Sequence, residues 1–387
     1  MKPMKILHTG DWHLGKIVHG IHMTEDQKYV IDQIIQCVEK EQPDVVIIAG
    51  DLYDRSVPPK DAVELLNDAL TAICVQQNTP VLAISGNHDS ADRLGFGASL
   101  FRGQQLYIHT EIGQALTPIT LEDGAGAIDF YAVPYTEPEE VAAFFEDDHI
   151  DTHHKAMERM VQEIEATMNT NHRNIFIGHT FLRGGEETES EERLTVIGGT
   201  PYVEAELLDS FDYVALGHLH QAQKITSPHL RYSGSILKYS FSEANHQKSI
   251  TLLEIDEHQK VECEKIPLHP RRDMRIVEGY FNDFIEERVI RKTEDYLHIQ
   301  LLDDGQINDP VSRLRELFPN ILRLERKNFF TQQSLTDIQQ MKERQTMTHE
   351  ELFAAFYKEI KGEEMPKERE RYVYKWIQSL MKEERNH

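Results

Sequence analysis

The sequence predicts an α/β protein built around a parallel β-sheet. Residues 5–89 alternate short apolar runs with amphipathic helical patterns, in the order strand, helix, strand, helix, strand. That order needs crossover connections, and crossovers produce parallel strand pairing. Each of the three predicted strands also ends in a glycine followed by polar residues. In parallel sheets, functional groups gather beyond the carboxyl ends of the strands.

The N-terminal elements follow from local patterns. Residues 5–9 form the first expected strand, and residues 26–41 carry apolar side chains at helical spacing. A continuous β-branched run at 45–49 is typical of a strand buried on both faces. A second helix is predicted from Pro59 to about Gln77, and the third buried strand at 80–84.

The middle of the chain continues the same alternation. Strands are predicted at 128–133, 174–177 and 211–216, with helices from about Pro138 and over roughly 155–169. Later strands are expected at 231–239, 249–255 and 260–267, and we expect them to be antiparallel and to form a second sheet against the first.

Composition changes near residues 267–272, where we predict a domain boundary. Residues 1–270 are then one domain, 271–335 a small α/β domain, and 336–387 a C-terminal helical segment. That last segment reads as two amphipathic helices broken near Pro366. Its apolar stripes include Leu352, Phe356, Trp376 and Leu380, which suit either a helical hairpin with its own core or helices that dock into a partner's groove.

Bulk composition limits the classes of protein. The chain has 387 residues and a formal net charge of −25, so its surface as a whole repels polyanions. Its three cysteines are far apart, which argues against a disulfide framework and favours a reducing compartment. Neither a membrane-spanning run nor a hydrophobic signal core is apparent, so we expect a cytoplasmic protein.

Five predicted strand ends carry residues of the kind that bind divalent metals. They supply Asp11, His13, Asp51, Asn87, His179, His218 and His220. A pair of metals that splits a phosphate ester needs oxygen and imidazole ligands, including one carboxylate that bridges both ions. In the H-x-H pattern, His218 and His220 share one side of the chain while Leu219 faces the other. Any one of these histidines alone would more simply be a surface residue, but five such strand ends in order favour a metal centre.

The ordered motifs D-x-H, G-D-x-x-D, G-N-H-D, G-H and G-H-x-H resemble those of the calcineurin-like metallophosphoesterase superfamily, over roughly residues 4–265. The resemblance implies a four-layer α/β/β/α sandwich and two divalent metals. It implies one ion held by Asp11, His13, Asp51 and His220, and another held by Asp51, Asn87, His179 and His218.

The resemblance also implies a catalytic role for His88, which would stabilise or protonate the leaving oxygen. Such a histidine needs a partner that fixes its tautomer, and either Asp54 or Asp89 could supply one. Both aspartates could equally cap turns without any chemical role. Asp54 stands where some relatives of this superfamily carry a histidine, so a histidine-pair mechanism does not carry over.

The flanking residues are most similar to the bacterial SbcD nuclease family, through ILHTGDWHLG at 6–15, GDLYD at 50–54, SGNHDS at 85–90 and GHLH at 217–220. This implies a Mn²⁺-dependent nuclease of DNA repair, recombination and replication. It would degrade duplex DNA from the 3′ end and cut hairpins or single strands endonucleolytically. The implied partner is SbcC, an SMC-like ATPase that receives the C-terminal helices, in a heterotetramer containing a homodimer of this chain.

Two other functions fit parts of the pattern. The stretch GDLYDR resembles serine/threonine phosphatases, whose arginine grips phosphate, but Ser56 replaces the glycine expected after Arg55. A metal-free scaffold would be expected to lack ligands, and none is missing. For DNA, Arg55 and Lys16 are candidate phosphate contacts, although each could be an ordinary surface cation. Given the acidic chain, we expect much of the DNA affinity to come from the ATPase.

Overall fold

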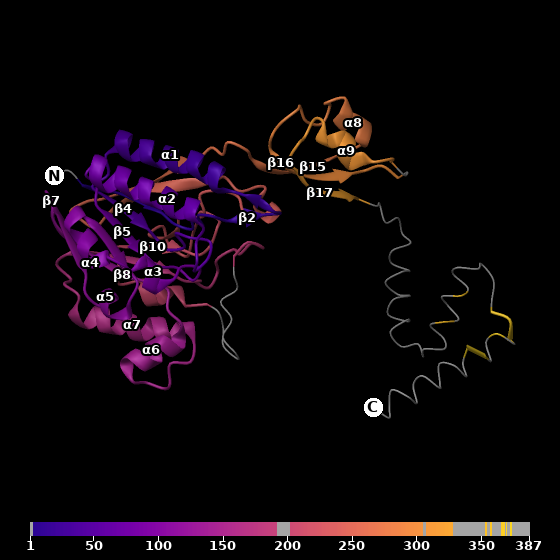
Figure 1. Ribbon diagram of the computed structural model, residues 1–387. Helices are drawn as coiled ribbons and strands as arrows, with labels where there is room; N and C mark the ends of the chain where they lie inside the picture. Colours follow the sequence, from indigo (N-terminus) through magenta and orange to yellow (C-terminus); the bar gives the residue numbers. More distant parts are fainter. Residues whose placement is uncertain are drawn as a thin grey trace. The chain divides into compact units, whose positions relative to one another are not determined.

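The computed structural model describes residues 3–191, 202–304 and 307–327, with a few later residues: 353, 357, 365–367, 369, 372 and 373 (Figure 1). The chain divides into two compact units. One contains residues 1–301 and 307–325, and the other contains residues 302–306 and 326–387. The predicted partner-binding residues Leu352, Phe356, Trp376 and Leu380 lie outside the described residues.

The first of two large sheets has six strands in the order β14-β13-β1-β4-β5-β6. Its strands are β1 (Met4–Thr9), β4 (Val45–Ile48), β5 (Val81–Ile84), β6 (Leu106–His109), β13 (Ser249–Ile255) and β14 (Val261–Pro267). Strands β1, β4, β5 and β6 are parallel, as the sequence predicts. The expectation that 249–255 and 260–267 build a second sheet is wrong. Strand β13 pairs antiparallel with β1 because it is apolar on both faces and therefore suits an interior position.

The second large sheet also has six strands, in the order β11-β12-β10-β9-β8-β7. Its strands are β7 (Ile119–Asp123), β8 (Gly126–Val133), β9 (Arg173–His179), β10 (Tyr213–Gly217), β11 (Gln223–Lys224) and β12 (Leu230–Tyr232). Strands β8, β9, β10 and β12 are parallel. The strand expected at 231–239 is shorter in the structure, because β12 ends at Tyr232 and residues 233–240 form no strand.

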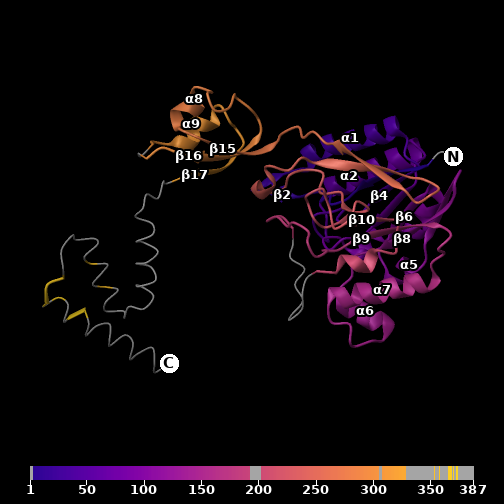
Figure 2. The ribbon, with the colours of Figure 1, turned by 180° about the vertical axis from the view of Figure 1, so that it is seen from behind.

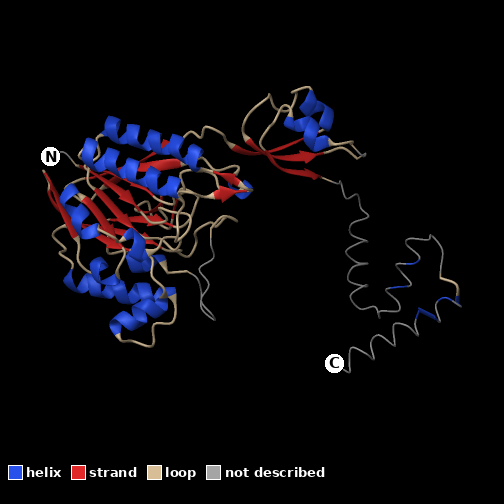
Figure 3. Cartoon of the chain, in the orientation of Figure 1, coloured by secondary structure: helices blue, strands red, loops and turns tan. Residues whose placement is uncertain are grey.

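The two sheets pack face to face, and helices cover their outer faces (Figures 1 and 3). Helix α1 (Thr24–Glu41) and helix α2 (Lys60–Leu70), which continues as the π-helical segment η1 (Thr71–Gln76), cover the first sheet. Helices α5 (Ile112–Ala115), α6 (Pro138–Phe145) and α7 (His153–Thr167) lie on the side of the second sheet, also seen from behind in Figure 2. This is the four-layer α/β/β/α sandwich that the family resemblance implies.

The layers are held by three hydrophobic clusters. One lies between the sheets and includes Ile6, Ile47 and Ile175, so neither inner face meets water. The other two lie between each sheet and its helices. Shorter elements complete this part of the chain: β2 (Ile17–Val18), β3 (Ile21–His22), α3 (Ala91–Leu94), α4 (Ala98–Phe101), η2 (Arg102–Gln104), η3 (Ala205–Leu208) and η4 (Phe241–Glu243).

Residues after 270 form a smaller three-stranded sheet, ordered β15-β16-β17, with two short helices. These elements are β15 (Met274–Gly279), α8 (Phe281–Ile285), β16 (Tyr296–Leu301), α9 (Pro310–Arg315) and β17 (Ile321–Arg326). They enclose a hydrophobic cluster of their own around Phe284 and Phe318. The sequence pattern after residue 270 predicts strands at 297–302 and 321–325 and a helix at 311–317, which correspond to β16, β17 and α9, but it misses β15 and α8. None of the helices in the described ranges is long and apolar enough to cross a bilayer.

One buried carboxylate ties this small sheet to helix α1. Asp26, in the first turn of α1, accepts a hydrogen bond of 2.7 Å from the hydroxyl of Tyr296 on β16. It accepts another of 3.1 Å from Nε of Arg272. Because Asp26 is fully buried, these two donors supply the partners that its charge needs there.

Candidate metal centre

The polar residues predicted at the strand ends meet at one edge of the sandwich. Strands β1, β4 and β5 of the first sheet end beside strands β9 and β10 of the second. Two glycines permit this approach. A Cβ atom on Gly217, at the end of β10, would lie 1.9 Å from the carbonyl oxygen of Ala49, and one on Gly86 would lie 2.2 Å from Oδ1 of Asp51. Neither position can hold a larger residue without moving the metal-binding edge.

Several of the residues at this edge hold an unusual backbone conformation. Asp11, His13 and Asp51 have φ angles of 50°, 45° and 48°, and His218 has 106°. Non-glycine residues with positive φ cost on the order of 1–3 kcal/mol each and persist only where the surrounding structure holds them. The turns therefore cost stability, and they aim four candidate ligands into one space.

One half of the site is formed around His13. Its Nε2 lies 3.0 Å from Nε2 of His220 and 3.5 Å from Oδ2 of Asp51. Two imidazole nitrogens this close either share a proton or face the same cation. Beside them, Oδ2 of Asp11 is buried and has no hydrogen-bond partner among the described residues. A buried carboxylate oxygen in that state fits a cation ligand.

The other half is formed around His179. Its Nε2 lies 3.3 Å from Oδ2 of Asp51 and 3.0 Å from Oδ1 of Asn87. Nδ1 of His218 is 3.3 Å from the same Asn87 oxygen. Nδ1 of His179 lies 2.9 Å from the carbonyl oxygen of Ala49, to which it donates a hydrogen bond, and so Nε2 is the nitrogen that faces the site. Oδ2 of Asp51 contacts both halves, as a bridging carboxylate must.

The electrostatics of the edge suit a divalent cation. Burial raises the pKa of Asp11 to about 6. Burial alone would raise the pKa of Asp51 too, but His179 and His13 hold it well below its usual value. Burial lowers the pKa of His13 and of His218 well below the usual range, so both are neutral and can act as ligands.

His179 is the exception among these histidines. Burial would lower its pKa, but Asp51 and Asp11 outweigh this and raise it to about 9. The proton on His179 thus compensates the carboxylates when no cation does so. Candidate ligand atoms of His13, Asp51 and His88, and of Asp11, Asp51 and His179, lie within 4.8 Å of one another. Carboxylates, imidazoles and one amide, with Asp51 common to both groups, fit a pair of divalent ions.

His88 lies next to this pair, with its ring centroid 4.8 Å from that of His13. Its Nδ1 donates a hydrogen bond of 2.9 Å to the carbonyl oxygen of Asp54. A main-chain oxygen thus holds the Nδ1 side of the ring. The carboxylate of Asp89 instead accepts hydrogen bonds from the main-chain nitrogens of Leu52, Tyr53 and Gly86, which fixes the loop.

The two candidate phosphate contacts occupy different positions. Nζ of Lys16 forms a 2.6 Å ion pair with Oδ1 of Asp54 and lies 5.5 Å from the ring centre of Tyr239, so it sits at the rim of the site. Arg55 follows Asp54 and is exposed. The structure thus brings Lys16 to the metal-binding edge and leaves Arg55 on the surface beside it.

Sequence reasoning missed Gln27, a buried residue of α1. Its side-chain nitrogen donates to the carbonyl oxygens of His13, at 2.7 Å, and Trp12, at 3.2 Å. Its side-chain oxygen accepts from the main-chain nitrogen of Gly15. Gln27 therefore clamps the strained loop that carries Asp11 and His13. A signal was present, since position 27 continues the buried stripe of α1, where a polar residue needs a reason.

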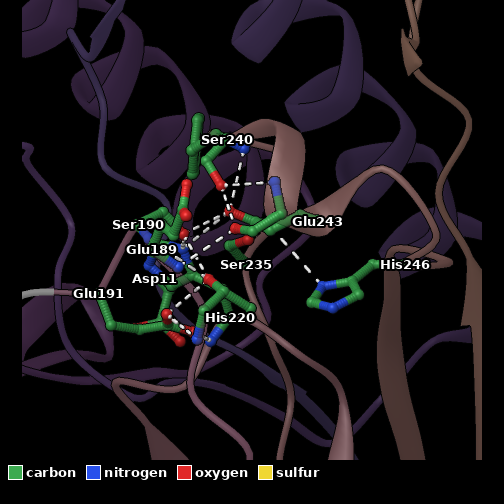
Figure 4. A network of polar contacts seen from close by, with 12 residues as sticks. Asp11, Glu189, Ser190, Glu191, His220, Ser235, Ser240, Glu243 and His246 are labelled. Carbon is green, nitrogen blue, oxygen red and sulfur yellow. Dashed lines mark hydrogen bonds and ion pairs between the residues drawn. The ribbon is translucent and has the colours of Figure 1, made fainter. Parts of the chain in front are cut away.

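Sequence patterns also gave no indication of the polar residues that surround His220 on the side away from His13. They come from the 184–191 loop and from the segment around η4, and include Ser190, Glu191 and Glu243 (Figure 4). Glutamates in a glycine-rich loop have the composition of a surface segment, so local patterns give no sign that they reach the site.

Comparisons with known proteins agree with this geometry. The family model described as calcineurin-like phosphoesterase matches residues 4–222, and the one described as Type 5 capsule protein repressor C-terminal domain matches residues 270–361. The chain is 38% identical over 381 residues to a protein of Staphylococcus saprophyticus named as the D subunit of the nuclease SbcCD, covering 98% of this chain and 99% of that one. A protein of the same name from Staphylococcus epidermidis is 40% identical over 322 residues, covering 83% and 85%.

Two solved structures are more distant. The protein TT1561 of Thermus thermophilus aligns with 68% of this chain and 99% of its own, at 12% identity and a TM-score of 0.37. A dimetal phosphatase from Danio rerio aligns with 70% of this chain and 100% of its own, at 12% identity and a TM-score of 0.42. The family assignment comes from the sequence matches: the chain belongs to the calcineurin-like phosphoesterases and, within them, to the family of SbcD-type nucleases, the D components of SbcCD.

Proposed function

We propose that the protein is the nuclease component of an SbcCD-type complex and hydrolyses phosphodiester bonds in DNA. It acts as a 3′-to-5′ exonuclease on duplex ends and as an endonuclease on single strands and hairpins, in DNA repair, recombination and replication. The observation that carries this function is the convergence of metal-binding side chains from five strand ends on one edge, in a chain whose near full-length relatives are named nucleases. A phosphoprotein phosphatase is not favoured, because those relatives match both the phosphoesterase region and the residues that follow it.

The metals are Mn²⁺ in this proposal. One position is held by Asp11, His13, Asp51 and His220, and the other by Asp51, Asn87, His179 and His218. When bound, two such ions stabilise the charge that develops on the phosphate and supply a nucleophile at neutral pH. The protein's part is to hold seven side chains in place before substrate arrives, and the strained turns and Gln27 serve that purpose.

His88 is the proposed catalytic residue that touches the leaving oxygen. Its Nδ1 is engaged by the carbonyl oxygen of Asp54, and the opposite nitrogen, Nε2, then stabilises or protonates the leaving group. Asp54 acts through this carbonyl oxygen, while its carboxylate holds Lys16. We assign Lys16, and less directly the exposed Arg55, to contacts with the DNA phosphates.

The partners in this proposal are DNA and an SbcC-type SMC-like ATPase. Residues 1–270 are the nuclease domain, 271–335 the capping domain, and 336–387 the segment that docks on the ATPase through Leu352, Phe356, Trp376 and Leu380. Since the chain carries a net charge of −25, the ATPase supplies much of the affinity for DNA.

We further propose that the nuclease is a homodimer within a heterotetramer. Large apolar side chains are exposed along η1 and around α3 and α4, among them Val75, Phe96, Leu100 and Phe101. Phe96 and Leu100 are 83% and 80% exposed, and a cluster of apolar groups in this state is typical of an interface. A self-complementary contact across this surface would close a dimer. Light scattering should report a dimer for the wild-type chain and a monomer for the Phe96→Ser/Leu100→Ser variant.

The function is tested with protein loaded with Mn²⁺ and offered end-labelled duplex DNA, a DNA hairpin and a phosphopeptide. We expect cleavage of both DNA substrates and no release of phosphate from the peptide. Phosphopeptide turnover without DNA cleavage would instead identify a phosphatase. His88→Gln should lower the cleavage rate by about 10²- to 10⁴-fold with the bound metal unchanged. Loss of metal from that variant would remove His88 from its proposed role.

A further inference from the structure

A buried acid, Glu243, lies beside Nδ1 of His220, the ring nitrogen opposite the one that faces His13. Figure 4 shows Glu243 and His220 with the polar residues around them. Glu243 has no exposed surface, yet its carboxylate faces a dense set of donors. It accepts hydrogen bonds from the hydroxyl of Ser190, at 2.5 Å, and from the main-chain nitrogen of Tyr239, at 3.2 Å. It also forms an ion pair with Lys248, which is buried as well. A charged carboxylate in such a place is fixed in position by its partners.

Proton counting around Ser190 determines the tautomer of His220. The serine hydroxyl has one proton. Oγ1 of Thr188 lies 2.8 Å from the serine Oγ, but the carboxylate of Glu243 is closer, at 2.5 Å, and charged, so the proton is donated to Glu243. Oγ of Ser190 is also 2.8 Å from Nδ1 of His220, so here the serine oxygen must accept and Nδ1 must carry the proton. Oε1 of Glu243 lies 3.3 Å from the same nitrogen and attracts that proton too. Nε2 of His220 is left with its lone pair directed toward His13 and the metal-binding edge.

The backbone of His220 is held by the same set of residues. Its main-chain nitrogen donates to Oε1 of Glu191 at 2.7 Å, and its carbonyl oxygen accepts from Nζ of Lys248 at 2.8 Å. Lys248 also donates to the hydroxyl of Ser235, which keeps the ammonium in place. His220 is thus fixed at its nitrogen, its oxygen and its ring. The other proposed ligands of its metal lie on strained turns, and Gln27 clamps the turn that carries Asp11 and His13.

We propose that Glu243 is a positioning residue for metal binding. With Ser190 as a bridge and Lys248 as its fixed counter-charge, it presents Nε2 of His220 to one metal position and sets the affinity of that position alone. Glu243 is not itself a ligand, because Lys248, Ser190 and His220 already surround its carboxylate. This inference rests on the ligand assignment in the proposed function. Partners of this kind, behind a ligating histidine, change metal affinity by about 10- to 100-fold.

The chain contains a matched control. Asp129 on β8 accepts a 2.6 Å hydrogen bond from the hydroxyl of Thr120 and lies 2.8 Å from Nδ1 of His172. This is again a buried carboxylate with one hydroxyl and one imidazole. Asp129 lies in the amino-terminal half of its strand, whereas the proposed ligands lie at or beyond the carboxyl ends of theirs. Asp129→Asn therefore perturbs the fold in a comparable way without touching a ligand.

The test is a Mn²⁺ titration of the full chain, followed by calorimetry and by electron paramagnetic resonance. Glu243→Gln alone would leave Lys248 buried without its anion, so the principal variant is Glu243→Gln/Lys248→Met, which removes both charges. We expect it to bind one Mn²⁺ as the wild type does and the second about 10- to 100-fold more weakly, with a mononuclear signal where the wild type shows a coupled pair. Ser190→Ala should shift the same ion by roughly fivefold, the effect of one lost hydrogen bond. Asp129→Asn should bind both ions normally.

Two outcomes would overturn the inference while the wild type still binds a coupled pair. In one, Glu243→Gln/Lys248→Met and Ser190→Ala bind both Mn²⁺ ions as Asp129→Asn does. In the other, both ions weaken equally, which would mean a general effect on folding. If the wild type itself fails to bind two Mn²⁺ ions, the ligand assignment in the proposed function is wrong. The two failures are therefore distinguishable.

Discussion

The two ends of the β-sandwich both bury charged residues, but they satisfy them differently. At the amino end of β9, Arg173 pairs with both carboxylate oxygens of Asp123, at 2.5 and 2.9 Å. The same guanidinium donates to the carbonyl oxygens of Gly126 and of Ile255, which belongs to the other sheet. At the carboxyl end, Oδ2 of Asp11 is buried without a hydrogen-bond partner in the described part of the chain.

The difference separates what holds the fold from what performs the chemistry. The amino-end pair is complete within the protein and links the two sheets, so its charges serve stability. The carboxyl end keeps two carboxylates close together, turns four residues into positive φ, and depends on a cation from outside to balance them. Stability is given up at one end of the same strands to leave a metal site open.

The largest expected effect comes from removing the carboxylate common to both halves of the site. Asp51→Asn should lower the rate of DNA cleavage by roughly 10³-fold or more, because neither ion keeps its bridging ligand. Calorimetry should show that tight binding of two Mn²⁺ ions is lost, while circular dichroism of the metal-free protein stays unchanged. A variant that still binds two ions tightly would remove Asp51 as the bridge.

The second prediction concerns stability at the amino end. Asp123→Asn leaves the guanidinium of Arg173 buried without its anion, which should lower the free energy of unfolding by about 3–5 kcal/mol. Urea denaturation measures this change. Binding of Mn²⁺ at temperatures where the variant is folded should equal that of the wild type, and weaker binding would mean that the two ends are coupled.

The third prediction replaces an aspartate with asparagine at the carboxyl end of the strands. There the free energy of unfolding should rise, whereas Asp123→Asn lowers it. Burial raises the pKa of Asp11 to about 6 from an ordinary value of 3.8, so above pH 6 the folded metal-free protein holds a costly charge. Asp11→Asn should therefore stabilise the metal-free protein at pH 7.5 by roughly 1–3 kcal/mol, while weakening Mn²⁺ binding. Destabilisation of similar size to that of Asp123→Asn would contradict the proposed contrast between the two ends.

The smallest expected effect is the pH dependence of the stability that Asp11→Asn adds to the metal-free protein. Between pH 4 and 6 the folded protein keeps a proton on Asp11 that the unfolded chain has lost, so the cost of Asp11 shrinks as the pH falls. The stability difference between Asp11→Asn and the wild type, both without metal, should fall to roughly half by pH 5 and to roughly a fifth at pH 4. A difference that stays constant with pH would show that the gain has another source. Saturating Mn²⁺ should reverse its sign at pH 7.5.

Sequence patterns predicted a large part of this edge because the information is local. A glycine followed by Asp, Asn or His after a buried strand identifies five of the seven candidate ligands, and the parallel order brings these strand ends together. Strands β13 and β14 were assigned to the wrong sheet because pairing with β1, more than 200 positions earlier, leaves no local pattern. Nδ1 of His88 is held by a main-chain oxygen, and no residue type reveals such a contact.

The residues behind His220 also could not be predicted from local sequence patterns. Glu243 and Ser190 are 53 positions apart and meet only because two loops cross beside His220. Gln27 was more accessible to prediction, since it interrupts an apolar stripe. Buried polar residues on otherwise apolar faces therefore deserve the same scrutiny as glycine-led strand ends.

Two adjacent residues in the first turn of α1 connect two parts of the protein. Asp26 is bonded to Tyr296 and Arg272 of the segment after residue 270, and its neighbour Gln27 is bonded to the carbonyl oxygen of His13. A pull on the smaller sheet would thus be transmitted through a single peptide link to the loop that carries His13. The first turn of α1 therefore joins the smaller sheet and the loop that carries His13 through adjacent residues.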